Sequence, residues 1–156
     1  MSTQNIADKL KELGLELPET VAPVANYVPY VVSGKHVYVA GQIPLVGGKV
    51  AHVAKVGADY TTEQAMEAAK VCALNILAQV NAAVGGDWSK VKRCVKLGAF
   101  VNSTPDFIDQ SSVANGASDL MVAVMGEAGK HARFAVSAPS LPRGVAVEVD
   151  AVFELN

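Results

Sequence analysis

Residues 145–155 read VAVEVDAVFEL, and their side chains alternate strictly between two sets. This two-residue period is that of a β-strand. One set is wholly apolar: Val145, Val147, Val149, Ala151, Phe153 and Leu155. The other mixes acids with small apolar residues: Ala146, Glu148, Asp150, Val152 and Glu154. We expect the apolar face to pack on helices, while composition leaves open whether the mixed face meets water or another subunit.

The strongest helical pattern in the chain covers residues 61–84. Thr61 and Gln64 have the spacing of a capping box at its start. An apolar stripe then recurs at steps of three and four residues: Met66, Ala69, Ala73, Ile76, Val80 and Ala83. Such a stripe is typical of a helix with one face on a sheet.

A second helical pattern covers residues 105–129, with Pro105 in its first turn and an interruption at Asn115-Gly116. On the strand at 91–101, we expect Val95 and Leu97 to share one face. The predicted strands are residues 27–32, 36–40, 49–53, 91–101, 132–138 and 145–155. This order predicts an α+β fold with one sheet and both helices on the same face.

The 156 residues suit a single domain. Residues 1–24 form an N-terminal extension, with a helix over 6–13 that resembles an appendage, and residues 25–156 form the core. Leu10, Leu13 and Leu15 give this helix a small apolar edge.

Composition excludes several classes of function. The net charge of −2 offers no basic surface for nucleic acid. No apolar stretch is long enough to span a membrane, and the charged N-terminus is not a secretion signal, so we expect a cytoplasmic protein. Cys72 and Cys94 are predicted to be buried thiols. A hydrophobic content of 51% against 18% charged residues favours an oligomer interface.

Two segments resemble the YjgF/RidA family. The first is VYVAGQIP at residues 37–44, which is similar to a family strand that usually ends Ser-Gly-Gln. The second combines Arg133 in ARFAV, Pro142 nine residues later, and Glu148 in VEV. The order and length of the elements agree over residues 25–156, and the stretch around residues 115–120 resembles the longer-chain branch of the family.

The resemblance implies a chorismate-mutase-like fold assembled as a homotrimer. Three sheets would form an inner β-barrel, with helices outside and a ligand cleft at each subunit boundary. Better-studied members hydrolyse reactive 2-imino or 2-enamino acids to 2-keto acids and ammonia. Because imines are already reactive, this chemistry requires positioning and no metal or cofactor.

Two residues of the signature are candidate catalytic groups. The planar guanidinium of Arg133 can bind a carboxylate through two parallel hydrogen bonds, and a small carboxylate metabolite is the partner that this predicts. Glu148 matches the carboxylate that orients water in the family, and it could serve in proton transfer. Two other roles remain open, since the pair could neutralise each other and Glu148 could face solvent.

Three further residues are candidate ligand contacts. Tyr27 stands fourteen residues before Gly41, as does a cleft tyrosine of the family, although a half-buried interface position fits equally. Gly41 permits a ligand to approach the backbone. Asn115 matches a cleft asparagine, although an asparagine at a helix break is the simpler interpretation.

Some positions depart from the family pattern. Ala40 and Ala135 replace a usual serine and cysteine, and His131 stands where proline or alanine is usual. The loss of two polar groups leaves open a trimer that binds a small carboxylate without catalysis. A third possibility is the endoribonuclease or translation-inhibitor activity for which the family is often labelled, which the acidic composition disfavours.

Overall fold

The computed structural model describes residues 6–20 and 25–156 of the chain. One sheet contains five strands in the order β1-β2-β7-β5-β6, and two short strands form a separate hairpin. The strands of the sheet are β1 (Tyr30–Ser33), β2 (His36–Gln42), β5 (Val91–Asn102), β6 (Ala132–Ala138) and β7 (Val147–Leu155). The hairpin strands are β3 (Leu45–Val46) and β4 (Lys49–Val50), and the helices are α1 (Ile6–Glu12), α2 (Thr62–Ala83) and α3 (Gln110–Met125).

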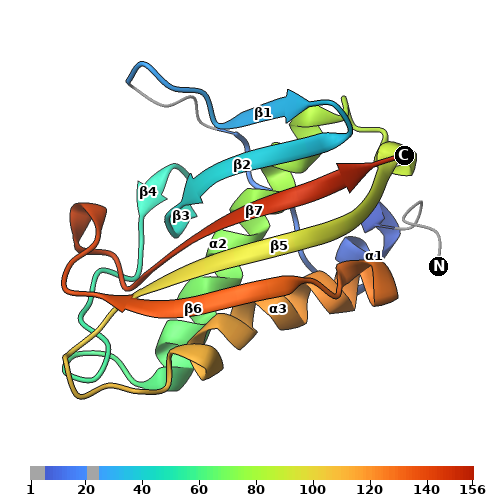
Figure 1. The fold of residues 1–156 in the computed structure, drawn as a ribbon. Helices are drawn as coiled ribbons and strands as arrows, with labels where there is room; N and C mark the ends of the chain where they lie inside the picture. The colour runs from blue at the N-terminus through green and yellow to red at the C-terminus, as the bar shows by residue number, and fades with distance from the viewer. Residues whose placement is uncertain (1–5, 21–24) are drawn as a thin grey trace.

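Helices α2 and α3 lie side by side on one face of the sheet (Figure 1). Helix α2 contacts β2 and β7, whereas α3 contacts β5 and β6. The sheet is mixed, because β5 and β6 are parallel and α3 connects them, while the other neighbouring strands are antiparallel. The predicted α+β class and the one-sided helical layer are confirmed.

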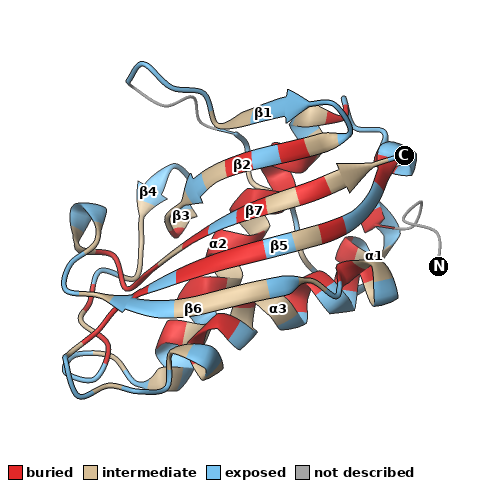
Figure 2. Ribbon diagram, viewed as in Figure 1, coloured by how far each residue is buried: buried red, intermediate tan, exposed pale blue. Residues whose placement is uncertain are grey.

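The last strand, β7, occupies the centre of the sheet between β2 and β5. Its predicted alternation is confirmed: Val147, Val149, Ala151 and Phe153 are buried, and Leu155 is partly buried. Figure 2 shows buried and more exposed positions alternating along the strand. The apolar set of residues 145–155 therefore forms the core against the helices, and the mixed set lies on the opposite face of the sheet.

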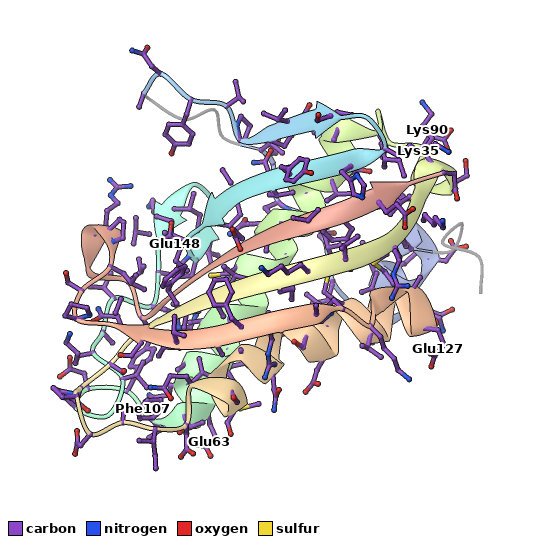
Figure 3. All side chains as sticks on the ribbon, in the orientation of Figure 1. Lys35, Glu63, Lys90, Phe107, Glu127 and Glu148 are labelled. Carbon is purple, nitrogen blue, oxygen red and sulfur yellow. The ribbon has the colours of Figure 1, made fainter. Side chains whose placement is uncertain are left out.

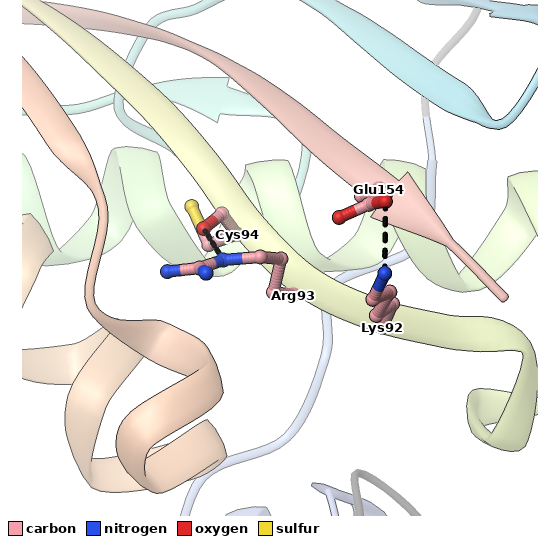
Figure 4. Close-up of polar contacts among 4 residues, drawn as sticks. All are labelled: Lys92, Arg93, Cys94 and Glu154. Carbon is pink, nitrogen blue, oxygen red and sulfur yellow. Dashed lines mark hydrogen bonds and ion pairs between the residues drawn. The ribbon is translucent and has the colours of Figure 1, made fainter.

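Strand β5 does not follow the simple alternation that we expected, because Cys94 is buried and Val95 only partly so. The register between β5 and β7 shifts twice in this stretch. Such irregularities insert residues that exchange the two faces. Around them, Lys92 Nζ lies 3.1 Å from Glu154 Oε1 on β7, and Arg93 Nε donates to the carbonyl oxygen of Cys94 at 3.4 Å (Figure 4).

The predicted capping box at the start of α2 is present. The Gln64 N–H donates to Thr61 Oγ1 at 3.2 Å, and the Thr61 N–H donates to Gln64 Oε1 at 2.9 Å. These bonds satisfy backbone donors that the first turn of a helix leaves free.

The start of the second helix was predicted wrongly, since α3 begins at Gln110 and not near Pro105. The backbone on either side of Pro105 makes non-helical hydrogen bonds. The Phe107 N–H donates to Thr104 O at 3.1 Å, and the Thr104 N–H donates to Val56 O at 3.0 Å. These bonds hold residues 104–107 in a turn beside the loop that precedes α2. Helix α3 therefore begins only after this turn, at Gln110.

The predicted interruption at Asn115-Gly116 is also wrong, because α3 continues unbroken through both residues. Gly116 is present for a packing reason. A Cβ atom at this position would lie 2.1 Å from the carbonyl oxygen of Met66 on α2. The missing side chain therefore lets the two helices approach closely, and this advantage outweighs the low helix propensity of glycine.

We expect Gly116→Ala to lower the free energy of unfolding by about 1–3 kcal/mol, although alanine is the better helix former. The clash is with backbone, so the helices must move apart to relieve it. Urea denaturation followed by circular dichroism measures the change. A gain in stability would contradict the close approach, since at a helix break or an open helical site alanine would be neutral or favourable.

Most predicted strands agree with the structure to within two residues, and two differ by more. The first begins at Tyr30 and not at residue 27, so Tyr27 precedes the sheet. The third, expected at 49–53, is reduced to Lys49–Val50 in the β3-β4 hairpin, and Val53 makes only an isolated bridge to Val145. Lys49 and Val50 pair with β3, and Val53 pairs with Val145 just before β7. The segment therefore adds no strand to the main sheet.

Helix α1 was expected to be an appendage, but its Ile6 and Leu10 are buried in the same core as the other helices. Cys72 and Cys94 are free and buried, as predicted. Burial raises the pKa of the Cys94 thiol to about 12. Among the helices of residues 6–20 and 25–156, none is long and apolar enough to cross a membrane.

Candidate functional site

The face of the sheet opposite the helices carries exposed apolar side chains. Tyr38 is 49% exposed, Phe100 38% and Val136 43%. Phe100 and Phe134 meet edge to face with ring centroids 5.4 Å apart, and Lys96 Nζ lies 5.5 Å from the centre of the Phe134 ring. Within the described residues, no helix covers this face (Figure 1). Such an apolar surface is typical of an interaction site.

Glu148 stands on this uncovered face, on the mixed side of β7, and Figure 3 shows it near the end of β2. It is half-buried, and a Cβ atom at Gly41 would lie 2.6 Å from its Oε1 atom. Gly41 lies in the stretch where the register between β2 and β7 shifts. Glycine at position 41 therefore provides the space that the Glu148 carboxylate occupies.

The pKa of Glu148 is raised above its ordinary value, first by burial and then by the negative charge of Asp150. The pKa of Asp150 is also raised, chiefly by burial, against the opposing effects of the Gly98 N–H and Lys96. No described residue donates a hydrogen bond to the Glu148 carboxylate. A carboxylate in this state can exchange protons nearer to neutral pH than a solvated one.

Arg133 lies on the edge strand β6, in register with the buried Leu97 of β5, so its side chain is on the helical side of the sheet. It reaches α3 and is held there by three hydrogen bonds. Nη1 donates to Asn115 Oδ1 at 2.8 Å and to Ser118 Oγ at 3.1 Å, and Nη2 donates to the carbonyl oxygen of Ser111 at 3.3 Å.

The structure thus brings the predicted site residues together in two pairs. Gly41 lies against Glu148, and Asn115 binds Arg133. The two pairs are on opposite faces of one sheet and do not meet within a single chain. Tyr27 lies in the segment before β1 and is 59% exposed.

Ser118 is a contact of Arg133 that the sequence alone did not reveal. Residues 111, 115 and 118 follow one another at steps of four and three, which places them on one flank of a helix. That spacing was available in the sequence, but the predicted break at Asn115-Gly116 concealed it. His131, noted only as a departure from the family pattern, also contacts Ser118, with Nε2 2.9 Å from Oγ.

Comparison with known proteins identifies the family of the chain. The profile described as "YjgF/chorismate mutase-like, putative endoribonuclease" matches residues 7–155, nearly the whole chain. The chain belongs to this family. The resemblance carried by residues 37–44, Arg133, Pro142 and Glu148 is confirmed.

Three similar proteins match this chain over nearly its whole length. Protein TCP17 of Trypanosoma cruzi is 49% identical over 159 residues, which cover 100% of this chain and 98% of that protein. The crystal structure of Atu1372 from Agrobacterium tumefaciens is 48% identical, with a TM-score of 0.90, and the match covers 99% of this chain and 95% of that one. A structure from Shewanella oneidensis, described as a "putative endoribonuclease", is 34% identical, with a TM-score of 0.92 and coverage of 96% and 99%.

Proposed function

We propose that this YjgF family protein hydrolyses reactive 2-imino and 2-enamino acids to 2-keto acids and ammonia, in a cleft between the subunits of a homotrimer. The observation that carries the proposal is the state of Glu148. It is half-buried, its pKa is raised, and it lies beside the exposed backbone of Gly41. A raised pKa brings the carboxyl group nearer to neutral pH, where it exchanges protons more effectively.

The arrangement of the two pairs supports a cleft that is shared between copies. Because Arg133 and Glu148 lie on opposite faces of the sheet, one chain cannot apply both to the same small molecule. The Arg133–Asn115 pair of one copy would face the Glu148–Gly41 pair of the next. The exposed apolar side chains of the uncovered face would be buried in the trimer, where three sheets form the inner barrel. Tyr27 would line the cleft from its exposed segment.

The reaction needs a held carboxylate and a proton acceptor beside water. Arg133 binds the substrate carboxylate, which fixes the imine carbon. Glu148 takes a proton from water as the oxygen–carbon bond forms, and it passes this proton to the imine nitrogen, which leaves a carbinolamine and the free carboxylate. In the second step the carbinolamine hydroxyl loses its proton to Glu148, which protonates the amine nitrogen. The C–N bond breaks, ammonia leaves, and the C–O bond becomes the keto group. No metal or cofactor enters these steps.

One experiment tests the function directly. 2-Iminopropionate and 2-iminobutyrate are generated in place, and the release of ammonia and keto acid is measured against the spontaneous rate. Light scattering on the same sample gives the mass. We expect acceleration by a trimer. A monomeric mass would remove the shared cleft, and a trimer that accelerates neither substrate would contradict the proposed hydrolysis.

A non-catalytic role in binding a small carboxylate is the second candidate, and one observation favours it. Ala40 precedes Gly41, and Ala135 follows Arg133 by two residues on β6, so neither position offers a hydroxyl or thiol to a ligand. A trimer that binds pyruvate but does not accelerate imine hydrolysis would support this role.

The pKa of Glu148 predicts how activity depends on pH. The carboxylate form is present above its pKa, so we expect kcat/KM to fall as the pH drops through this raised value. Since Asp150 contributes to raising it, Asp150→Asn should move this acidic limb to lower pH. The rate over pH 4–9, corrected for spontaneous hydrolysis, measures the shift.

Glu154→Gln is the matched control, because Glu154 is on the same strand and face but pairs with Lys92. It should leave the acidic limb where it is in the wild type. An unmoved limb in Asp150→Asn, or one moved to higher pH, would show that the limb does not report Glu148.

A further inference from the structure

We propose that Ser118 and His131 form a hydrogen-bonded relay that positions the Arg133 guanidinium for a carboxylate ligand. The relay runs from the carbonyl oxygen of Gly129 through His131 and Ser118 to Arg133. It extends the proposed function, because it assigns two positioning residues to the arginine that binds the substrate.

The direction of each bond in the relay follows from the chemistry of its ends. His131 Nδ1 lies 2.6 Å from the carbonyl oxygen of Gly129, which can only accept, so Nδ1 carries the proton. In a neutral imidazole the other nitrogen, Nε2, is then an acceptor. Ser118 Oγ, 2.9 Å away, donates its proton to Nε2.

The direction at Ser118 determines what it offers to the arginine. With its proton directed to His131, the Ser118 oxygen presents lone pairs to Arg133 Nη1 at 3.1 Å. A serine that is not held this way could rotate its proton toward the guanidinium. His131 therefore keeps Ser118 in the orientation in which it accepts from Arg133, and Gly129 keeps His131 in the required tautomer.

The relay also decides which donors of Arg133 are left for a ligand. Asn115 and Ser118 occupy both protons of Nη1, and the Ser111 carbonyl occupies one of Nη2. Of the five N–H groups on a guanidinium, Nε–H and the second Nη2–H remain. Two such donors can bind both oxygens of one carboxylate, provided that the guanidinium stays in place.

Holding the guanidinium matters because a free arginine side chain has many rotamers. Ordering them on binding costs affinity, and a side chain that is already held avoids this cost. Helix α3 supplies three hydrogen-bond acceptors to the guanidinium. Through Ser118 and His131, the guanidinium is also linked to Gly129, in the segment before β6. Truncation of Ser118 should thus weaken carboxylate binding even though Ser118 itself touches no ligand.

The first readout is the tautomer of His131, which does not depend on any activity. Nitrogen-15 NMR of the full-length protein should show His131 protonated at Nδ1 and unprotonated at Nε2 at pH 7.5. Protonation at Nε2, alone or together with Nδ1, would overturn the relay, because Ser118 would then accept a hydrogen bond from His131 and not donate one.

The second readout is binding of pyruvate, the keto acid that 2-iminopropionate would yield, measured by calorimetry. We expect Ser118→Ala to raise the Kd about tenfold, because one hydrogen bond to a charged group is lost. In the imine assay the change should be mainly in KM, with kcat less affected, since Glu148 is untouched. Ser118→Thr keeps the hydroxyl and should restore most of the affinity.

Two comparisons separate the relay from a general structural effect. Ser112→Ala removes a hydroxyl from the same helix and should leave the Kd unchanged. His131→Ala should raise the Kd, and the Ser118→Ala/His131→Ala double variant should be no weaker than Ser118→Ala, because the two residues act in series. Additive effects would overturn the relay. If the wild type does not bind pyruvate, the role of Arg133 in the proposed function fails, while the NMR signal still decides whether the relay exists.

Discussion

Replacing Arg133 by alanine is expected to reduce kcat/KM for 2-iminopropionate by about 100-fold or more. Two charge-assisted hydrogen bonds to the substrate carboxylate contribute about 1.5–3 kcal/mol each, and about 1.4 kcal/mol corresponds to a factor of ten. The substrate is generated in place, and ammonia release is followed with the wild type and the variant side by side. The same variant should lose measurable binding of pyruvate.

The control for Arg133→Ala removes a positive charge elsewhere. Lys90 is exposed and lies at the other end of the sheet from Glu148 (Figure 3), so Lys90→Ala should retain the wild-type rate. Circular dichroism checks that Arg133→Ala keeps its fold. A folded variant with an undiminished rate would exclude Arg133 from the site and leave its bonds to α3 as a structural feature.

The second large effect is expected for Glu148→Gln, which should lower kcat by about 10²- to 10⁴-fold while KM changes little. Glutamine has nearly the same shape but cannot take a proton from water. Carboxylate binding by Arg133 should be unaffected, so pyruvate should bind the variant as it binds the wild type. This division between kcat and KM distinguishes Glu148 from the residues that hold the ligand.

Stability provides the control for Glu148→Gln. The raised pKa of Glu148 means that the folded protein disfavours the charged form. This cost is absent below the ordinary pKa of a glutamate and grows as the pH rises through the raised value. The neutral glutamine removes it, so the variant should melt no lower than the wild type at pH 7.5. Unchanged kcat in such a stable variant would remove Glu148 from the mechanism.

Much of the fold could be predicted from residue order because the relevant signals are local. The alternation in residues 145–155 identified a strand with one buried face, and the capping box at Thr61 and Gln64 marked the start of α2. These patterns need no partner in order to be recognised, since side-chain direction in a strand and backbone donors at a helix end depend on neighbours in sequence. The family motifs around Gly41 and Arg133 likewise stand in the sequence itself.

The errors arose where a distant contact outweighs the local preference. Asn115-Gly116 is typical of a helix break. Gly116 nevertheless lies within α3, because the backbone carbonyl of Met66 on α2 leaves no room for a side chain there. Val95 had the expected alternation, but a shift in register against β7 places Cys94 inside. A sequence pattern does not reveal a steric clash or a shift in strand register, because both depend on the packing of segments far apart in the chain.

The sequence by itself determined the α+β class, the central strand, the long helix and the family to which the chain belongs. Only the tertiary structure decided that Glu148 meets Gly41 on one face of the sheet, while Arg133 joins Asn115, Ser118 and His131 on the other. The reason is geometric. The period of a strand or helix assigns a side chain to a face, but the pairing of strands and the packing of helices decide which faces come within the roughly 3 Å that a hydrogen bond requires.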